Sequence, residues 1–427
     1  MRSWRAAGEA VALCALLVLS ACGGGGSDPP GAQDMGADQG VDMASASDLG
    51  VDQGVEDMGA EDMADPLVTL PPEPWDLAAR GHYNVGVYQE TITYTDSEGA
   101  ERKLRTVWWF PTRHKEGKGF RYAGLFEAPG VLRDVPAIDS PARLPVLVYS
   151  HGSQGFAEQS YFFTEHFASH GFVVVAPDHA GNTFLAGADA DTTVHALLRP
   201  QDIRATLDHL DTLATDHPLA GRLSEDLVLS GYSYGGYTAL ALGGGAYGLD
   251  VHEAECAGED PQSARCALML GHKDIFEAGF ADARVKLLLA QAPGGSTYLK
   301  GGLGGITTPT LLTTGGRDLS LPNESVGDPY WAQLSGSQHL RVNLTDAGHN
   351  AQSDVCDYNG RVLLATGACD DEQMDFGLAH TIINHYSLAF VRYHMMGDDA
   401  QAALLNGDAP YELMTVSRNG DAVTRAD

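Results

Sequence analysis

The sequence predicts an α/β fold in which helices cover both faces of a mostly parallel central sheet. Two observations support this prediction. Short apolar segments typical of buried strands recur along the chain, and several of them end in a glycine-rich turn that carries a polar residue. About 360 residues follow the first 66, which is enough for one large domain, at 67–427, with insertions and a substantial core.

The N-terminus has the features of a bacterial lipoprotein signal peptide, which we assign to residues 1–21. Two arginines precede an apolar run, Val11–Leu19, that is too short to span a bilayer. The run leads into Leu-Ser-Ala-Cys, which resembles a bacterial lipobox with Cys22 as the lipidated residue. Gly23 favours, by the same resemblance, the outer membrane. We expect an exported protein that is anchored to the membrane through Cys22; an ordinary secretory signal peptide is the alternative.

Residues 22–66 have the composition of a disordered spacer. They contain glycines and regularly spaced acidic residues but no Lys, Arg or aromatic residue, so they cannot bury enough apolar surface to offset their ordering entropy. The spacing of Asp34, Asp38 and Asp42 lacks the dense ligand loop of a calcium site. We therefore expect a self-repelling linker. The formal net charge of −31 also argues against nucleic acid as a partner.

A nucleophile elbow is predicted around Ser233. A strand at Asp226–Ser230 is followed by Gly-Tyr-Ser-Tyr-Gly-Gly at 231–236 and by a helix at Tyr237–Leu242. A serine on such a tight strand-to-helix turn leaves no room for neighbouring side chains, so glycines flank it at two-residue spacing. A glycine-rich turn with an incidental serine is the alternative.

Two later loops supply the partners that a nucleophilic serine needs. The segment that begins at Thr308 reads as a short apolar strand ending in a glycine turn and Asp318. A second strand, His339–Leu344, is followed by a turn that carries His349, 31 residues after Asp318. Each could be a solvated loop residue, but the order Ser, acid, His is the order that an elbow predicts. We therefore predict a catalytic triad of Ser233, Asp318 and His349.

The loop after another strand is expected to form an oxyanion hole. Leu144–Ser150 reads as a central strand, and His-Gly-Ser-Gln-Gly follows it at 151–155. Backbone N–H groups of such a loop point at the negative charge that develops on a carbonyl oxygen. We assign the two donors to the N–H groups of Ser153 and Tyr234, with Gln154 as the alternative to Ser153.

Four motifs together resemble a known group of enzymes. They are Tyr149–Gly155, Phe167–His179, Arg199–Leu210 and the elbow with its helix. The set resembles the α/β-hydrolases, namely the dienelactone-hydrolase-like proteins and the platelet-activating-factor acetylhydrolase and bacterial cutinase branches, over roughly residues 83–397. The resemblance implies the α/β-hydrolase fold and a serine enzyme that cleaves carboxylic esters through an acyl-enzyme, without a metal or organic cofactor. It also implies Asp318 as the acid and His349 as the base.

Two positions depart from these families. Dienelactone hydrolases use a cysteine nucleophile, whereas this chain has Ser233, which argues against a muconolactone substrate. Polyester-degrading cutinases carry a tryptophan after a Gln-Ala-Pro segment, and here Gly294 follows Gln291–Pro293, which weakens a polyester assignment. The expected partner is a small-molecule or polymeric ester whose acyl and alcohol parts stay open.

Four cysteines follow Cys22, and an even number in an exported chain indicates disulfides. Sequence alone permits three pairings. We favour two local pairs, Cys256 with Cys266 and Cys356 with Cys369. The first would close a loop in an insertion at about 246–284, and the second would brace an insertion at about 350–375, just beyond His349. No two cysteines have the close spacing of a zinc site, so no metal is expected.

Two further segments complete the predicted fold. Residues 83–110 alternate between apolar and polar around a turn at Asp96, which predicts a hairpin. Phe376–Met396 has helical periodicity and predicts a last helix packed on the sheet. Asp178 and His179 end a strand at the edge of the sheet that carries the triad, and we give them no catalytic role.

Two other classes of function stay open. The elbow also resembles that of prolyl-oligopeptidase-type serine peptidases, but fewer than eighty residues separate Pro66 from the strand at Leu144, and they show no blade repeat of a propeller domain. A non-catalytic surface binding protein on the same fold is the second alternative. The complete triad argues against it.

Overall fold

A computed structural model describes residues 70–425 of the chain, except 72, 125, 185–191, 259–262 and 359–373. Four predicted features lie outside the described residues: the signal peptide at 1–21, the lipidation site Cys22, the spacer at 22–66, and Cys369. All described residues belong to one unit, Leu67–Asp427.

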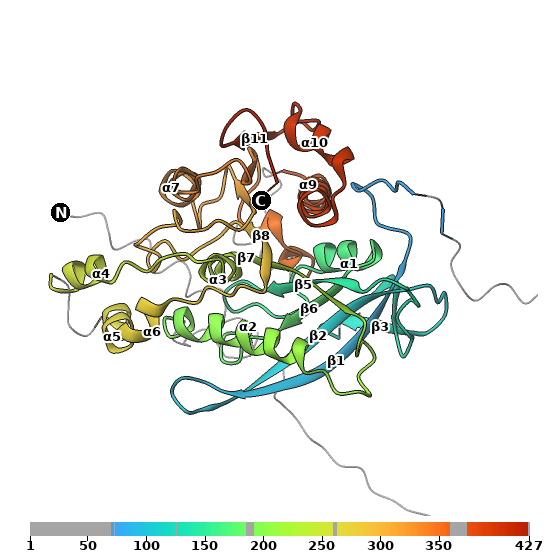
Figure 1. Cartoon of the computed structure of the whole chain (residues 1–427), viewed down its shortest axis with the longest axis horizontal. Coiled ribbons are helices and arrows are strands. Elements are labelled where there is room, and N and C mark those ends of the chain that lie inside the picture. Colours follow the sequence, from blue (N-terminus) through green and yellow to red (C-terminus); the bar gives the residue numbers. More distant parts are fainter. Residues whose placement is uncertain are drawn as a thin grey trace, which may run out of the picture. The chain divides into compact units, whose positions relative to one another are not determined.

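One mixed sheet of eleven strands organises the described part of the chain, in the order β11-β10-β9-β8-β7-β5-β6-β2-β1-β4-β3 (Figure 1). The strands are β1 (Asn84–Thr95), β2 (Glu101–Thr112), β3 (Lys118–Tyr122), β4 (Phe126–Arg133), β5 (Leu144–Ser150), β6 (Val173–Pro177), β7 (Leu223–Tyr232), β8 (Val285–Gln291), β9 (Thr310–Gly315), β10 (Leu340–Leu344) and β11 (Met414–Arg418). The block from β6 to β10 is parallel, and β2 and β11 pair antiparallel with its two sides. The predicted α/β fold with a mostly parallel sheet is confirmed.

The predicted hairpin is formed by β1 and β2, which pair antiparallel over their whole length. The Asp96 carboxylate closes the turn, because it accepts hydrogen bonds from the N–H groups of Glu98 and Ala100 at 3.0 and 2.9 Å. Trp108 and Trp109 of β2 face opposite sides of the sheet, and both are fully buried. The hairpin therefore extends the sheet beyond its parallel block and contributes to both halves of the core.

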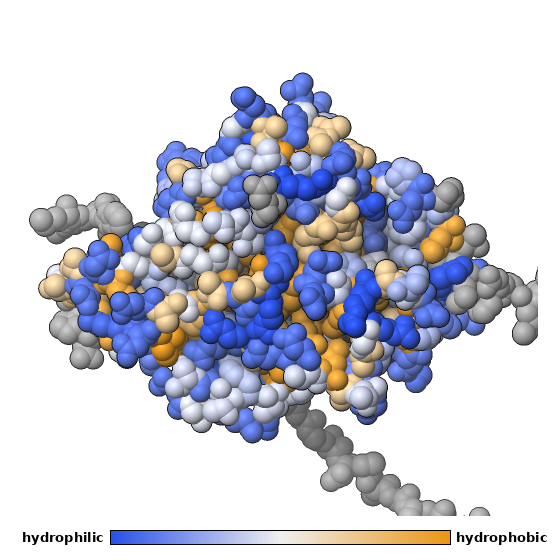
Figure 2. Space-filling model, viewed as in Figure 1, coloured by the Kyte–Doolittle hydropathy of each residue, from blue (hydrophilic) through white to orange (hydrophobic). Residues whose placement is uncertain are grey.

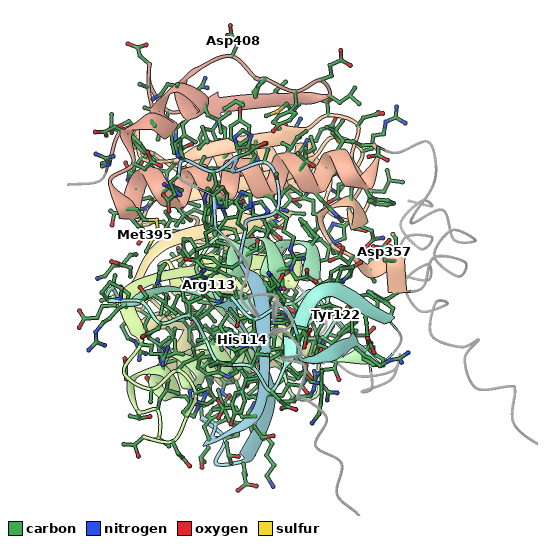
Figure 3. The ribbon with its side chains drawn as sticks, turned by 90° about the vertical axis from the view of Figure 1, so that its right-hand side faces the viewer. Arg113, His114, Tyr122, Asp357, Met395 and Asp408 are labelled. Atoms are coloured by element: carbon green, nitrogen blue, oxygen red, sulfur yellow. A yellow bond between two sulfur atoms is a disulfide. The ribbon has the colours of Figure 1, made fainter. Side chains whose placement is uncertain are left out.

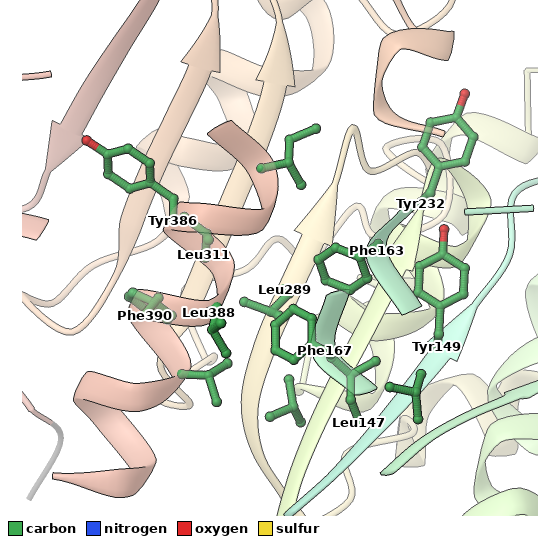
Figure 4. Close-up of a cluster of buried hydrophobic side chains, with 14 of the residues drawn as sticks. Leu147, Tyr149, Phe163, Phe167, Tyr232, Leu289, Leu311, Tyr386, Leu388 and Phe390 are labelled. Atoms are coloured by element: carbon green, nitrogen blue, oxygen red, sulfur yellow. The ribbon is translucent and has the colours of Figure 1, made fainter. Parts of the chain in front are cut away.

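Helices cover both faces of the sheet, as the sequence predicts. One face carries α1 (Tyr161–Ser169) and α9 (Phe376–Met396), and the other carries α2 (His195–Asp211) and α3 (Tyr234–Leu242). Side chains alternate along a strand, so Val146 and Val148 of β5 pack with α2 and α3. Leu147 and Tyr149 of the same strand pack with α1 and α9 (Figure 4). The core thus consists of two apolar layers, one on each side of the sheet.

Shorter helices lie in the connections. They are α4 (Leu249–Cys256), α5 (Ala264–Gly271), α6 (Lys273–Ala278), α7 (Asp328–Gln333) and α10 (Ala402–Asn406), with single turns at Asn323–Gly327, Asn350–Gln352 and Asp399–Gln401. A disulfide joins Cys256 to Cys266 and so ties α4 to α5. This pair is the one that the sequence predicts. The second predicted pair stays a prediction, because one of its cysteines lies outside the described residues.

The long helix α9 crosses one side of the molecule, with Met395 near its C-terminal end and Asp357 toward its other end (Figure 3). Hydrophilic residues interrupt the hydrophobic ones over the face that Figure 2 shows. Among the described residues, no helix is both long enough and apolar enough to cross a membrane. The parallel strands end at a common edge, where loops of an α/β sheet carry ligand sites.

Candidate active site

The turn between β7 and α3 has the strained geometry of a nucleophile elbow. Ser233 adopts φ 57° and ψ −116°, a conformation that non-glycine residues rarely adopt and that persists mainly at functional sites. Glycine is required on both sides of it. A Cβ on Gly231 would lie 2.3 Å from the Gly235 carbonyl oxygen, and a Cβ on Gly235 would lie 1.8 Å from the Ser150 carbonyl oxygen. The motif therefore forms the strand-to-helix turn that it predicts, with the serine at its apex.

The parallel block brings Ser233, Asp318 and His349 together at one edge of the sheet. Ser233 follows β7, Asp318 follows β9 and His349 follows β10. The His349 Nε2 atom lies 2.9 Å from the Ser233 Oγ atom, and the His349 Nδ1 atom lies 2.6 Å from one oxygen of the Asp318 carboxylate. The Asp318 side chain is 1% exposed and the His349 side chain is 15% exposed. The acid is thus buried behind a histidine that still reaches solvent.

The Asp318 carboxylate orients the histidine. Its other oxygen accepts hydrogen bonds from the N–H groups of Ser320 and Leu321, at 2.9 and 2.7 Å. One oxygen is therefore left for the imidazole, and a proton on His349 Nδ1 leaves Nε2 to accept the serine hydroxyl. The Tyr232 ring lies against the imidazole, with ring centroids 5.0 Å apart, and packing of this kind restricts the orientation of the ring.

One predicted oxyanion donor belongs to the peptide that follows the serine. The Ser233 carbonyl accepts hydrogen bonds from the N–H groups of Tyr237, at 3.2 Å, and Gly294, at 2.9 Å. A trans peptide is planar, with its N–H opposite to its carbonyl, so these bonds fix the direction of the Tyr234 N–H. Tyr234 is also the first residue of α3, where an N–H group has no acceptor within the helix.

The other predicted donor is fixed in the same way. The Gly152 carbonyl accepts hydrogen bonds from the Gly155 N–H, at 3.1 Å, and from His151 Nδ1, at 2.7 Å, which sets the direction of the Ser153 N–H. The His151 Nε2 atom accepts the backbone N–H of His179 at 3.0 Å, so the ring proton is on Nδ1. Burial lowers the pKa of His151 well below its usual value. The ring therefore stays neutral and holds the loop in one conformation.

Comparisons with known proteins bear on the fold and on the class of enzyme. A family model described as chlorophyllase matches residues 135–267, a range that contains the predicted oxyanion loop and the elbow. Among solved structures, a ferulic acid esterase from Streptomyces cinnamoneus is similar, with a TM-score of 0.54 and 17% sequence identity over 80% of this chain and 99% of that one. The chain has the α/β-hydrolase fold. A search of curated proteins gave no match. The predicted class, a carboxylic ester hydrolase, agrees with both comparisons.

Two exposed apolar side chains lie on segments that adjoin the candidate site. Leu319, the residue after Asp318, is 91% exposed, and Phe184 is 56% exposed. The Phe184 N–H donates to the Gly155 carbonyl at 3.3 Å, and its ring packs edge-on against Phe156, with centroids 5.4 Å apart. Exposed apolar residues at such positions are typical of a surface that receives apolar groups.

The structure holds a second Ser-His-Asp set, which the sequence did not predict. The His179 Nε2 atom lies 2.8 Å from the Ser150 Oγ atom, and His179 Nδ1 lies 2.9 Å from the Asp202 carboxylate. All three side chains are fully buried. Arg102 donates to both oxygens of the same carboxylate, at 2.8 and 2.9 Å. His179 and Asp202 both lie in motifs that carry the family resemblance, but no pattern in those motifs indicates that the two side chains meet.

Two histidines of α9 have structural contacts. The His380 ring stacks on Phe162, with centroids 3.7 Å apart, and His385 Nδ1 lies 2.7 Å from the Tyr411 hydroxyl. Within the described ranges, no group of three or more His, Cys, Asp and Glu side chains is placed to hold a metal ion.

Proposed function

We propose that this hydrolase cleaves carboxylic esters with Ser233 as the nucleophile, His349 as the general base and Asp318 as the residue that orients the histidine. The proposal rests above all on the two contacts of His349, 2.9 Å to the serine hydroxyl and 2.6 Å to the carboxylate. Nucleophilic acyl transfer requires a serine, a base and an orienting group within hydrogen-bond reach of one another. The likeness to a ferulic acid esterase and to the chlorophyllase family model supports an ester as the substrate.

Acylation follows from these positions. The Ser233 Oγ atom attacks the ester carbonyl carbon while its proton passes to His349 Nε2. The N–H groups of Ser153 and Tyr234 stabilise the negative charge on the carbonyl oxygen of the tetrahedral intermediate. The intermediate collapses as the C–O bond to the alcohol breaks, and the alcohol oxygen takes the proton from His349.

Deacylation repeats the sequence with water. His349 removes a proton from a water molecule, which attacks the acyl carbon, and the proton then returns to the Ser233 oxygen as the acid leaves. The exposed side chains of Phe184 and Leu319 support an apolar group on the substrate. The carboxylate of Asp318 stabilises the imidazolium that forms in each half-reaction.

Hydrolysis of p-nitrophenyl esters of increasing acyl length tests this proposal, with a prolyl amide substrate assayed beside them. We expect ester turnover that depends on acyl length, and no cleavage of the amide. Amide cleavage that is faster than ester cleavage would favour a peptidase. A wild-type protein that binds esters without cleaving them would favour a binding protein.

The location of the enzyme is a second part of the proposal. The apolar run before Cys22 and the lipobox-like sequence that includes it support export and diacylation of this cysteine, and several acyl chains hold a protein on a membrane where one barely does. Residues 23–66 would then separate the enzyme from the outer membrane. Radiolabelled palmitate should enter the wild-type protein in a bacterial host but not a Cys22→Ser variant. Equal labelling of both would exclude the lipid anchor.

A further inference from the structure

Arg199 in α2 is a fully buried arginine that the proposed chemistry does not use. Its Nη2 atom donates to the His151 carbonyl oxygen and, at 3.2 Å, to the Ser150 hydroxyl. Its Nη1 atom donates to the Asn182 side-chain oxygen at 2.6 Å, and its Nε atom donates to the Thr238 hydroxyl at 3.3 Å. One guanidinium group therefore joins the end of β5, the loop after β6 and helix α3.

Two of these segments carry the proposed oxyanion donors. His151 begins the loop that contains Ser153, and Thr238 lies one turn after Tyr234 on α3. The Thr238 hydroxyl donates in turn to the Tyr234 carbonyl at 3.0 Å. The Arg199 guanidinium also lies over the Tyr234 ring, 4.9 Å from its centroid, where a cation is attracted to the ring face.

The bond to the His151 carbonyl fixes a peptide that leads to Ser153. The carbonyl of the 151–152 peptide is held by Arg199, and its N–H donates to the Gln159 side-chain oxygen at 2.7 Å. A planar peptide held at both ends cannot rotate without breaking one of these bonds. The next peptide, which carries the Ser153 N–H, is therefore attached to a fixed support.

The charge of Arg199 is not balanced by a direct ion pair among these contacts. Its four hydrogen bonds within the described residues go to neutral oxygen atoms. Burial lowers the pKa of the guanidinium to about 10, so it remains charged at neutral pH. A buried cation costs desolvation free energy that an apolar side chain of similar size would avoid. The planar fork of donors is what an apolar residue or a lysine cannot supply.

We infer that Arg199 is a positioning residue of the oxyanion hole, which clamps the loop at 151–155 to helix α3 so that the Ser153 and Tyr234 N–H groups converge on one point. The inference rests on the proposed function. It predicts that Arg199 contributes to the rate of the chemical step while touching neither substrate nor Ser233.

The test uses Arg199→Lys and Arg199→Gln in the full chain, assayed with p-nitrophenyl butyrate. We count reactive sites by complete labelling with a fluorophosphonate, so that unfolded protein does not enter the rate. Both variants should lose about 100-fold in kcat per site, because a displaced oxyanion donor costs about that much. KM should change by less than about threefold, since the ester ground state does not depend on the hole.

A second readout separates positioning from a general structural role. A trifluoromethyl ketone forms an anionic tetrahedral adduct with a nucleophilic serine, so its affinity reports on the oxyanion hole. Its inhibition constant should weaken by the same factor as kcat/KM falls. A merely structural arginine would lower the melting temperature and the number of reactive sites, but leave this inhibition constant unchanged.

The matched control is Arg102→Gln, which removes another buried arginine of the same region. Arg102 donates to Asp202 and to the Ala180 carbonyl, and neither group lies on a segment with an oxyanion donor. This variant should lose stability and keep its kcat per site. Asn182→Ala, which removes one acceptor of the guanidinium, should lower kcat by roughly three- to tenfold and keeps the test decisive if both Arg199 variants fail to fold.

The outcomes distinguish this inference from the proposed function. If wild type cleaves esters, Ser233→Ala does not, and an Arg199 variant keeps its kcat per site within about threefold, the positioning role is wrong and the proposed function stands. If Arg199→Lys keeps full activity while Arg199→Gln loses it, the positive charge accounts for the loss. That result would also overturn positioning by the N–H donors of the guanidinium group. If wild type cleaves no ester, the proposed function fails first.

Discussion

The described part of the chain contains two Ser-His-Asp sets with nearly the same spacing and opposite surroundings. The outer set consists of Ser233, His349 and Asp318, and the inner set consists of Ser150, His179 and Asp202. The histidine lies 2.9 and 2.6 Å from the serine and the acid in the outer set, and 2.8 and 2.9 Å in the inner set. Spacing alone therefore does not identify a catalytic triad.

The two sets differ in their exposure to solvent and in the hydrogen bonds that the serine oxygen accepts. Every member of the inner set is fully buried, and its serine oxygen already accepts a hydrogen bond from Arg199. An oxygen with a lone pair bound by a guanidinium is a poor nucleophile. Ser233 instead stands on a strained turn with a positive φ of 57°. The comparison teaches that burial, and not spacing, separates the set that we propose for chemistry from the one that we expect to stabilise the fold.

Removing the serine from each set should give the largest contrast. Ser233→Ala should lower kcat by about 10⁴-fold or more, because the acyl-enzyme can no longer form, and adding His349→Ala should lower it little further, since the triad acts as one unit. Ser150→Ala should lower kcat by less than about tenfold. Steady-state hydrolysis of p-nitrophenyl butyrate measures all three. Similar losses from the two serine variants would remove the distinction between the sets.

Replacing the acid should lower kcat in the outer set and the free energy of unfolding in the inner set. Asp318→Asn should lower kcat by about 10⁴-fold by favouring the wrong histidine tautomer. Asp202→Asn should instead lower the free energy of unfolding by about 3 to 5 kcal/mol, because Arg102 is left as a buried charge without its partner. Urea denaturation measures the second effect, and the double variant with Arg102→Gln should lose less than the sum. An Asp202→Asn variant as stable as wild type would contradict the structural role of the inner set.

Acid should weaken the folded state through buried neutral histidines outside both sets. Burial lowers the pKa of His195, of His170 and of His380 to about 4 each, from a usual value of 6.5. Between these values the unfolded chain binds protons that the folded chain does not, so stability falls as the pH falls through this window. Each such histidine contributes a slope of up to about 1.4 kcal/mol per pH unit. Denaturation midpoints that are equal at pH 6.5 and pH 4.5 would rule this out.

The smallest effect is expected at the disulfide of the insertion, which touches neither set. Cys256→Ser with Cys266→Ser opens a loop with a sequence separation of 10, which should lower the free energy of unfolding by about 2 to 3 kcal/mol. The kcat should not change. The pair Cys356 with Cys369 should behave differently and lower kcat as well, because Tyr358 packs on Phe156 beside the oxyanion loop. Peptide mapping without reduction comes first, and a link between Cys256 and Cys356 would refute both pairings.

The parts of the fold that the sequence predicted best are those with strong periodicity. The strand Leu144–Ser150 and the helix Phe376–Met396 have the bounds that the sequence predicts. Boundaries differ where packing outweighs local preference. Helix α3 begins at Tyr234 rather than Tyr237, although its first turn holds two glycines, because that turn packs on the backbone of β5. The small strands β3 and β4 were not predicted, since Pro129 and Gly130 break the pattern of a strand.

The outer set was predictable because its order along the chain follows the elbow, and each member sits in a glycine-rich turn after a strand. The inner set was not, because Ser150 also ends a strand and nothing local indicates that its hydroxyl faces the core. Arg199 lies in one of the motifs that carry the resemblance, but its role was not predictable for the same reason. Buried hydrogen bonds between residues that are distant in sequence depend on helix α2 lying against the sheet, which single residues do not encode.

The close approach of Gly235 to Ser150 fixes how far the first turn of α3 lies from the end of β5. A Cβ at this position would lie 1.8 Å from a carbonyl oxygen of the neighbouring strand, so even a methyl group would push the helix away and carry the Tyr234 N–H with it. The distance between α3 and the end of β5 is thus set by the hydrogen atom that glycine carries in place of a side chain. Any residue larger than glycine at position 235 is therefore expected to shift the proposed oxyanion donor relative to the end of β5.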